Sequence, residues 1–202
     1  MDWQECSITA WYDEKLDSVA VPVLVKRGYT GMKASYSGFL FAVLAPLGFF
    51  AGAFWGFLVL LLSAFFYSVA RRLGKGSGSE TVEDFISVLL QRTSHFLYLL
   101  GFWVYFYMQG RWIVEATVCI ILAIILVALS DFVSDTIEFR DLNDTSGVLD
   151  APARVIFFLG WSLLLFVIFG AAEGLLWVGM IIFIAMMGLT LIQKLAFLLR
   201  RI

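Results

Sequence analysis

Residues 38–70 form one almost unbroken apolar run, and this feature constrains the fold more than any other. A helix needs about 20 apolar residues to cross the hydrocarbon core of a bilayer, because every buried amide must be hydrogen-bonded within its own segment. Pro46, Gly48 and Gly52 interrupt the run, which is too long for one span and short for two. We therefore expect a tight pair of membrane helices that turns near Gly48 to Gly52.

The rest of the chain has the same apolar character. Of the 202 residues, 61% are hydrophobic and 15% are charged, and the mean hydropathy is +0.92. The sequence predicts an all-α, polytopic membrane protein whose transmembrane domain, residues 38–202, contains six helices. After the first pair, the expected helices cover about residues 82–108, 112–130, 153–171 and 174–198.

The segments outside these helices are polar or mixed. Residues 1–37 combine charges with tryptophans and a short apolar stretch, which indicates an interfacial amphipathic segment. The stretch Arg71 to Glu80 is rich in glycine and serine and is expected to be a loop. The acidic stretch Asp131 to Asp150 is likewise expected to be a solvated loop.

The distribution of Lys and Arg predicts the orientation in the membrane, because these residues stay preferentially in the cytoplasm. With six crossings, the N-terminal bases, the linker bases and the C-terminal bases all fall on one side, and the opposite turns hold only Arg111. We therefore expect a multi-pass protein of the cell (inner) membrane with both termini in the cytoplasm. The net charge of −2, without a basic stripe, does not favour a nucleic-acid partner, and we expect none.

Ionisable residues inside the predicted helices are few. Arg92 and His95 lie in the helix expected at 82–108, and an antiparallel neighbour would bring Asp131 to the level of Arg92. We expect a structural ion pair between Arg92 and Asp131 rather than a proton path, since no carboxylate is expected near His95. A transporter would be expected to carry more buried polar groups than this.

The stretch around the glycine-serine linker has a recognisable spacing. Ala70-Arg71 is followed by eight residues, then Glu80, and then Asp84. This spacing resembles the signature of the CDP-alcohol phosphatidyltransferase family, Asp-x-x-Asp-Gly-x-x-Ala-Arg, eight or nine residues, then Gly-x-x-x-Asp-x-x-x-Asp. Ala70-Arg71 matches the Ala-Arg pair, and Asp84 falls on the third aspartate.

Matches of order and spacing extend this resemblance over most of the chain. Thr30 and Ser35 stand where the family has Thr-Pro-Asn-x-x-Thr, and Ser130, Pro152 and Arg154 agree with two later family segments. The resemblance implies a six-helix fold, a site that opens to the cytoplasm and homodimer formation.

The departures from the signature concern its metal ligands. In the family, four carboxylates hold two divalent ions at the CDP diphosphate, and the last one activates the attacking hydroxyl. Here the first two acids fall on Ser63 and Phe66, the glycine after them on Tyr67, and the fourth acid on Val88. Hard cations need oxygen ligands, and neither a phenyl nor an isopropyl group supplies one. The resemblance therefore implies the family fold without its usual two-metal site.

Two sets of residues remain candidates for a site. If the chain is active, Asp84 with Glu80 would bind Mg²⁺ or Mn²⁺. Arg71, Arg72 and Lys75 would bind the phosphates of a CDP-lipid, or serve only as a positive anchor at the cytoplasmic face.

We predict a catalytically degenerate relative of the family that acts as a partner or regulator in phospholipid metabolism. It would reside in the lipid bilayer as a homodimer, or as a heterodimer with an active homologue. Whether it is an enzyme is left open, with inactivity favoured. One alternative is an active or altered phosphatidyltransferase that moves a phosphatidyl group from a CDP-lipid to an alcohol. Another is a small transporter or an accessory subunit of a membrane complex.

Overall fold

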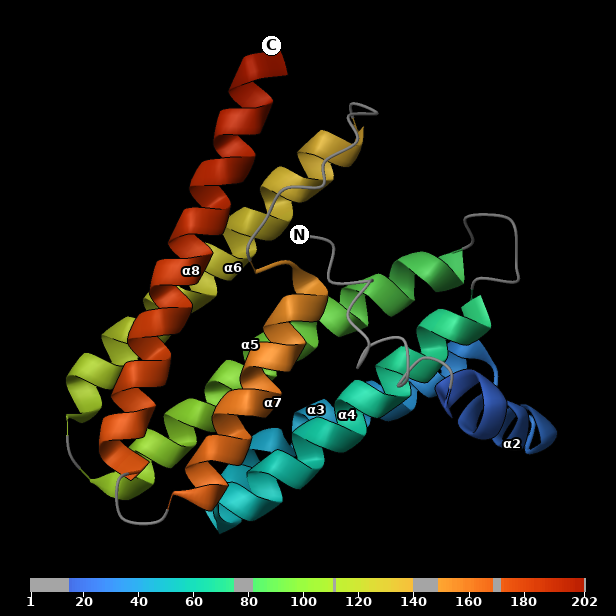
Figure 1. The fold of residues 1–202 in the computed structure, drawn as a ribbon, viewed down its shortest axis with the longest axis horizontal. Helices are drawn as coiled ribbons and strands as arrows, with labels where there is room; N and C mark the ends of the chain where they lie inside the picture. The colour runs from blue at the N-terminus through green and yellow to red at the C-terminus, as the bar shows by residue number, and fades with distance from the viewer. Residues whose placement is uncertain (1–14, 75–81, 111, 140–148, 169–171, 202) are drawn as a thin grey trace. The chain divides into compact units, whose positions relative to one another are not determined.

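The computed structural model describes residues 15–74, 82–110, 112–139, 149–168 and 172–201, which are helical and contain no strand (Figure 1). Contacts divide the chain into two compact units. Unit 1 comprises Met1–Val43 and Leu61–Ser94, and unit 2 comprises Leu44–Leu60 and His95–Ile202. The helices, in chain order, are η2 (Leu16–Ala20), α2 (Val21–Lys26), α3 (Gly31–Ala51), α4 (Ala53–Gly74), α5 (Val82–Gln109), α6 (Ile113–Phe139), α7 (Ala151–Val167) and α8 (Ala172–Arg201).

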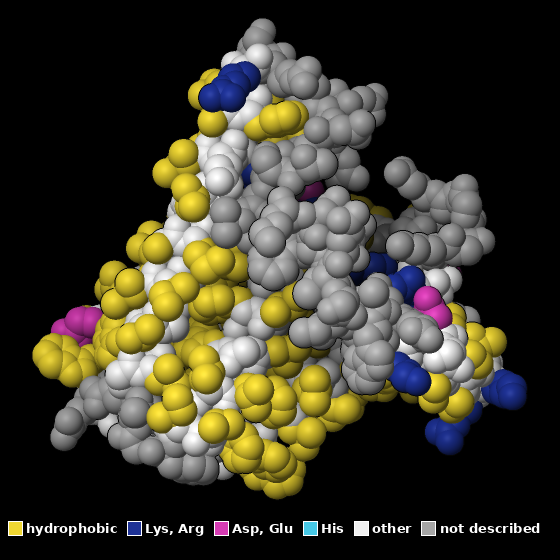
Figure 2. Space-filling view, in the orientation of Figure 1, with side chains coloured by type: hydrophobic (Ala, Val, Ile, Leu, Met, Phe, Trp, Pro, Cys, Tyr) yellow, Lys and Arg dark blue, Asp and Glu magenta, His cyan; other side chains and the backbone are white. Residues whose placement is uncertain are grey.

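Four of these helices are long and apolar enough to cross a membrane. They are Gly31–Ala51, Ala53–Gly74, Ile113–Ile137 and Gly174–Arg200. Their outward surface is apolar, as expected for contact with lipid, and hydrophobic side chains cover much of the described surface in Figure 2. The predicted all-α polytopic membrane protein is confirmed. The crossings predicted for α5 and for the shorter α7 stay predictions.

The predicted turn between the first two membrane helices is confirmed. α3 ends at Ala51 and α4 begins at Ala53, and Gly52 joins them with a φ of 134°, which L side chains rarely adopt. A methyl group added at Gly48 would lie 3.3 Å from Gly56 Cα, so glycine lets the two helices approach closely. Both helices are longer than expected, since α3 begins at Gly31 and α4 continues to Gly74.

α6 corrects the prediction of an acidic loop that begins at Asp131. This helix continues to Phe139 because its buried apolar face continues, with Val127, Val133 and Ile137 all in the core. Asp131 is itself only 9% exposed, so it is a buried helical residue and not a solvated one. The predicted loop falls partly on residues 140–148, which lie outside the described residues.

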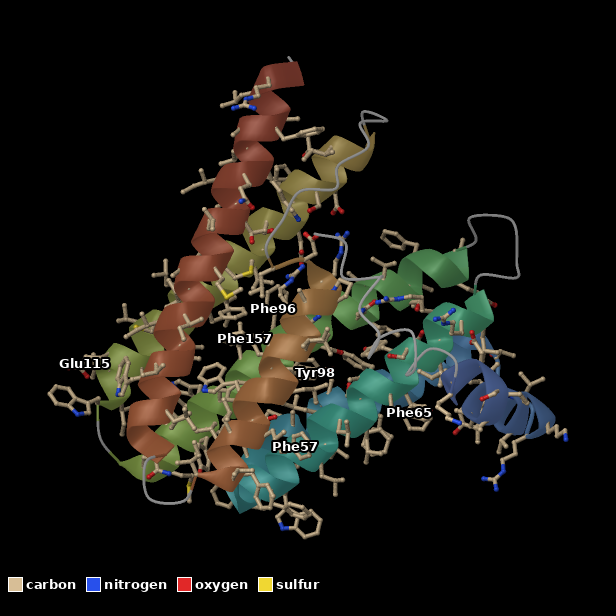
Figure 3. The ribbon with its side chains drawn as sticks, viewed as in Figure 1. Phe57, Phe65, Phe96, Tyr98, Glu115 and Phe157 are labelled. Atoms are coloured by element: carbon tan, nitrogen blue, oxygen red, sulfur yellow. The ribbon has the colours of Figure 1, made fainter. Side chains whose placement is uncertain are left out.

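Each unit has its own core. In unit 1, Leu16, Ala34, Val69 and Ala70 form a buried cluster that joins the N-terminal helical segment to α3 and α4. In unit 2, aromatic rings predominate, and Phe102 of α5 stacks on Trp161 of α7 with ring centroids 4.0 Å apart. Figure 3 shows the aromatic side chains that fill the spaces between the helices. The two cores position the polar side chains of each unit.

Candidate functional site

The positions that match the family signature lie in unit 1, on the last half of α4 and the first half of α5. Ser63, Phe66, Tyr67 and Ala70 repeat at helical spacing, so α4 turns them toward the same side. Val88 lies on α5. These positions are where the resemblance predicts the metal and nucleotide site.

Ser63, at the position of the first family acid, is fully buried and hydrogen-bonded. Its hydroxyl donates to the carbonyl oxygen of Gly38 on α3, with an Oγ–O distance of 2.6 Å. This bond satisfies the hydroxyl proton inside the protein and holds α4 against α3.

Phe66, at the position of the second family acid, lies in a column of aromatic rings. Its ring is 5.6 Å from that of Phe41, at an interplanar angle of 11°, and 6.2 Å from that of Tyr29, at 23°. Stacked rings at these separations attract one another and exclude water. The position is therefore filled by apolar packing.

Tyr67, at the position of the family glycine, is 6% exposed. Its hydroxyl shares a hydrogen bond of 2.7 Å with Ser94 of α5. Its ring lies against Gly38, where an added methyl group would be 3.1 Å from Tyr67 Cδ2. The tyrosine thus occupies the space beside α3 that a glycine would leave open.

Val88, at the position of the fourth family acid, is 47% exposed and offers no ligand. The polar contact at this level comes from its neighbour Ser87, whose hydroxyl is 2.6 Å from that of Ser35 on α3. Ser35, which matches the family by conservative replacement, also donates to the Gly31 carbonyl oxygen over 3.2 Å. The hydroxyl cluster of unit 1 consists of Ser35, Ser63, Tyr67, Ser87 and Ser94.

These residues do not fit a two-metal site. The hydroxyl cluster is uncharged, and the described residues contain no group of three or more His, Cys, Asp or Glu side chains that could hold a metal ion. The side chains of Phe66 and Val88 have no oxygen, and Ser63 offers a neutral hydroxyl in place of a carboxylate.

The structure describes the predicted site residues unevenly. Arg71 is exposed near the end of α4, and Arg72 forms an ion pair with Asp17 at 3.3 Å. Asp84 lies in the first turn of α5, but its side chain lies outside the described residues, as do Lys75 and Glu80. Metal binding by Asp84 and Glu80, and phosphate binding by the three bases, therefore stay predictions.

Unit 2 contains a second polar region that is charged. Arg154, near the start of α7, is 2% exposed and binds both carboxylate oxygens of Asp131 on α6 through its two terminal nitrogens. A bidentate pair of this kind is among the stronger polar contacts in proteins. The partner of Asp131 is thus Arg154 and not the predicted Arg92, because Arg154 lies within ion-pair distance and offers Asp131 two donors.

Lys194 extends this region to α8. It is 5% exposed, and its ammonium group donates to Ser134 Oγ over 2.6 Å and contacts Asp150 Oδ1 at 3.3 Å. One turn earlier, Thr190 Oγ accepts the Leu149 N–H over 3.0 Å. The α6–α8 polar cluster consists of Asp131, Ser134, Asp150, Arg154, Thr190 and Lys194.

Sequence reasoning missed Thr190 and Lys194. The available signal was their spacing, since two polar residues four positions apart on an apolar helix lie on one face. Thr190 and Lys194 bond to partners on α6 and in the chain just before α7. These contacts hold the three helices together.

The fold defined by these helices is that of a CDP-alcohol phosphatidyltransferase, a class of polytopic membrane protein. The likeness is to the crystal structure of phosphatidylinositol phosphate synthase from Mycobacterium tuberculosis with CDP-DAG bound. It has a TM-score of 0.61 and covers 88% of this chain and 92% of that one, at 21% sequence identity. The fold predicted from the signature spacing is confirmed. No family model matches the sequence, and no curated protein does.

Proposed function

We propose that this protein is a catalytically degenerate membrane protein of the CDP-alcohol phosphatidyltransferase fold that acts as a partner or regulator in phospholipid metabolism. The observation that carries the proposal is the ring of Phe66, which stacks on the rings of Tyr29 and Phe41 at the position of a metal-binding acid of the family. The buried Tyr67, hydrogen-bonded to Ser94, supports it at the next position.

The electrostatics of the reaction explain why these replacements matter. Two divalent ions beside a diphosphate need several carboxylates to balance their charge and complete their coordination. Asp84 is the one acid of the signature that this chain retains, and one carboxylate cannot form that cage. The fold can persist without it, because the hydroxyl and aromatic contacts of unit 1 hold α3, α4 and α5 together.

A role beside another protein would use what the chain retains. The related synthase binds CDP-DAG, so a CDP-lipid is the ligand that we would test first for this fold. By resemblance to the family, we propose a homodimer, or a heterodimer with an active homologue. We also propose that it resides in the cell membrane with both termini in the cytoplasm.

The direct test is CMP release. The purified full-length protein would be incubated with Mg²⁺ or Mn²⁺, CDP-diacylglycerol and a panel of alcohols, beside an active phosphatidyltransferase as positive control. We expect release at the level of protein-free membranes. Release that Asp84→Ala abolishes, and that the matched variant Glu83→Ala retains, would show that the protein is an active transferase.

The partner role has a separate test. The chain would be co-expressed with an active family member from the same membrane, and each would be purified through a tag on the other. We expect a stable complex and a changed turnover of the active member. Recovery of this chain alone, with unchanged turnover of the other, would remove the partner role.

A further inference from the structure

The helical segment of residues 16–26 has two faces of different character. Its inner face packs on unit 1, where the fully packed Leu16 and the partly buried Val21 and Leu24 contact the cluster around Val69 and Ala70. This contact joins the segment to α3 and α4, so the face turned away from them is also fixed.

Polar contacts hold the segment in this orientation. Asp17 forms an ion pair with Arg72 of α4, with a distance of 3.3 Å. In the turn after the segment, Lys33 Nζ donates to the Gly28 carbonyl oxygen over 2.8 Å. Gly28 has a φ of 74°, which allows the sharp reversal into α3.

The outer face of the segment combines apolar and basic side chains. Val19 and Val23 are 58% and 47% exposed, and Lys15 and Lys26 continue the same stripe at helical spacing. Arg27 follows and is also exposed. In Figure 2, dark blue and yellow side chains gather around α2. No described segment of unit 1 covers this stripe.

The position of the segment along the chain fixes what it can meet. It ends at Lys26, and the first membrane helix, α3, begins at Gly31. So short a connection keeps the segment at the level where α3 enters the bilayer. Valines with bases beside them are typical of a helix that lies in the interface, with its apolar side chains at the acyl boundary and its bases at the headgroups.

Among the residues that the structure describes, the charge at this surface is positive. Exposed bases are contributed by Lys15, Lys26, Arg27 and Arg71, whereas Asp17 is balanced by Arg72. Glu83, at the start of α5, is the other described carboxylate of unit 1. We infer that the outer face of residues 15–27 binds anionic phospholipid headgroups of the leaflet that α3 enters. This inference does not depend on the proposed function, because it concerns neither the signature positions nor a partner.

The preference of the protein for an anionic over a neutral lipid tests the role of the basic side chains. The full-length protein would be reconstituted in phosphatidylcholine bilayers with traces of spin-labelled phosphatidylglycerol or phosphatidylcholine, and the motionally restricted fraction of each label measured. We expect Lys26→Gln/Arg27→Gln to lower the preference for phosphatidylglycerol about fivefold or more, the contribution of one base at an anionic surface. The matched control Arg200→Gln/Arg201→Gln replaces two adjacent bases elsewhere. An equal loss in both variants, or no preference in the unsubstituted protein, would overturn the inference.

The depth of the segment in the membrane tests the role of its exposed valines. Val23→Cys, in a Cys6→Ser/Cys119→Ser background, would be labelled with an environment-sensitive fluorophore and exposed to brominated lipids. We expect quenching that increases when phosphatidylglycerol is added, and weaker quenching for the matched site Ser18→Cys. Inorganic phosphate added to phosphatidylcholine bilayers should not reproduce the effect. Equal quenching at both sites, or quenching insensitive to phosphatidylglycerol, would contradict binding through this face.

Discussion

The two polar regions of the molecule satisfy their side chains in opposite ways. The hydroxyl cluster of unit 1 uses neutral groups, as in the hydrogen bonds of Ser63 with Gly38 and of Tyr67 with Ser94. The α6–α8 polar cluster of unit 2 buries full charges, as in the pair of Arg154 with Asp131. A carboxylate inside a membrane protein is costly unless a cation lies beside it. Unit 2 supplies that cation from a neighbouring helix, whereas the signature positions of unit 1 retain a single acid, Asp84.

The largest expected effect is at the charged region. Asp131→Ala would leave the buried guanidinium of Arg154 without its carboxylate, and we expect a loss of about 3–5 kcal/mol in the free energy of unfolding. Unfolding of the purified protein in mixed micelles would measure it. Glu115→Ala, an exposed acid on the same helix, should change stability by less than ~0.5 kcal/mol. A loss below ~1 kcal/mol for Asp131→Ala would show that the charges are not held as the structure indicates.

The next prediction compares an uncharged and a charged replacement of Phe66, which stands at a signature position. Phe66→Ala removes the ring from its column and should cost about 1–3 kcal/mol, since Phe66 is only partly buried. Phe66→Asp should cost at least ~1 kcal/mol more, because the new carboxylate would lie against the rings of Tyr29 and Phe41. The free energy of unfolding of both variants would be measured with and without Mg²⁺. The difference between the variants gives the cost of the carboxylate, and the effect of Mg²⁺ shows whether a metal ion offsets that cost. Recovery of Phe66→Asp by Mg²⁺ would overturn this expectation, because it would show that one restored acid is enough to form a metal site with the remaining residues.

A smaller effect is expected for one neutral bond within the charged region. Thr190→Val removes the acceptor of the Leu149 N–H and should cost about 1–3 kcal/mol, because that amide is buried and would have no replacement. Thr136→Val is the matched control, since the Thr136 hydroxyl is exposed and bonds only within its own helix, to Phe132. Similar losses for both variants would argue against the link between α8 and the start of α7.

The smallest effect is expected at the hydroxyl cluster. Tyr67→Phe keeps the ring but removes its bond to Ser94, and we expect a loss of about 0.5–1.5 kcal/mol. A double-mutant cycle with Ser94→Ala would measure the coupling between the two hydroxyls. Tyr107→Phe, which alters an exposed ring, should be neutral. Zero coupling in the cycle would remove this bond from the account of unit 1.

The helices could be predicted from the sequence because their apolar runs are long and are separated by glycine-rich or polar breaks. The expected helix at 82–108 is α5, and the turn at Gly52 was expected from its glycines. The end of α6 could not be predicted in the same way. Asp131 is charged and was interpreted as solvated, but its cation, Arg154, lies on another helix that sequence spacing does not reveal.

Sequence reasoning could predict the positions of the candidate site but not the contacts that its residues make. Spacing identified Phe66 and Tyr67 as replacements, because the signature fixes the positions at which acids and glycine are expected. It could not identify what the replacements contact, since Ser94 and Tyr29 are distant in sequence and no local pattern joins them to α4. The partners of Lys194 were missed for the same reason.

The packing of Tyr67 bears on how the chain could change over generations. A return to glycine at this position would leave a ring-sized hole beside Gly38 and remove the hydrogen bond between Tyr67 and Ser94. An acid in place of Phe66 would lie against aromatic rings. Either of these two changes alone would lower stability before any ion could bind and compensate. Under the proposed function, this packing therefore opposes a return to the family pattern unless several positions mutate together.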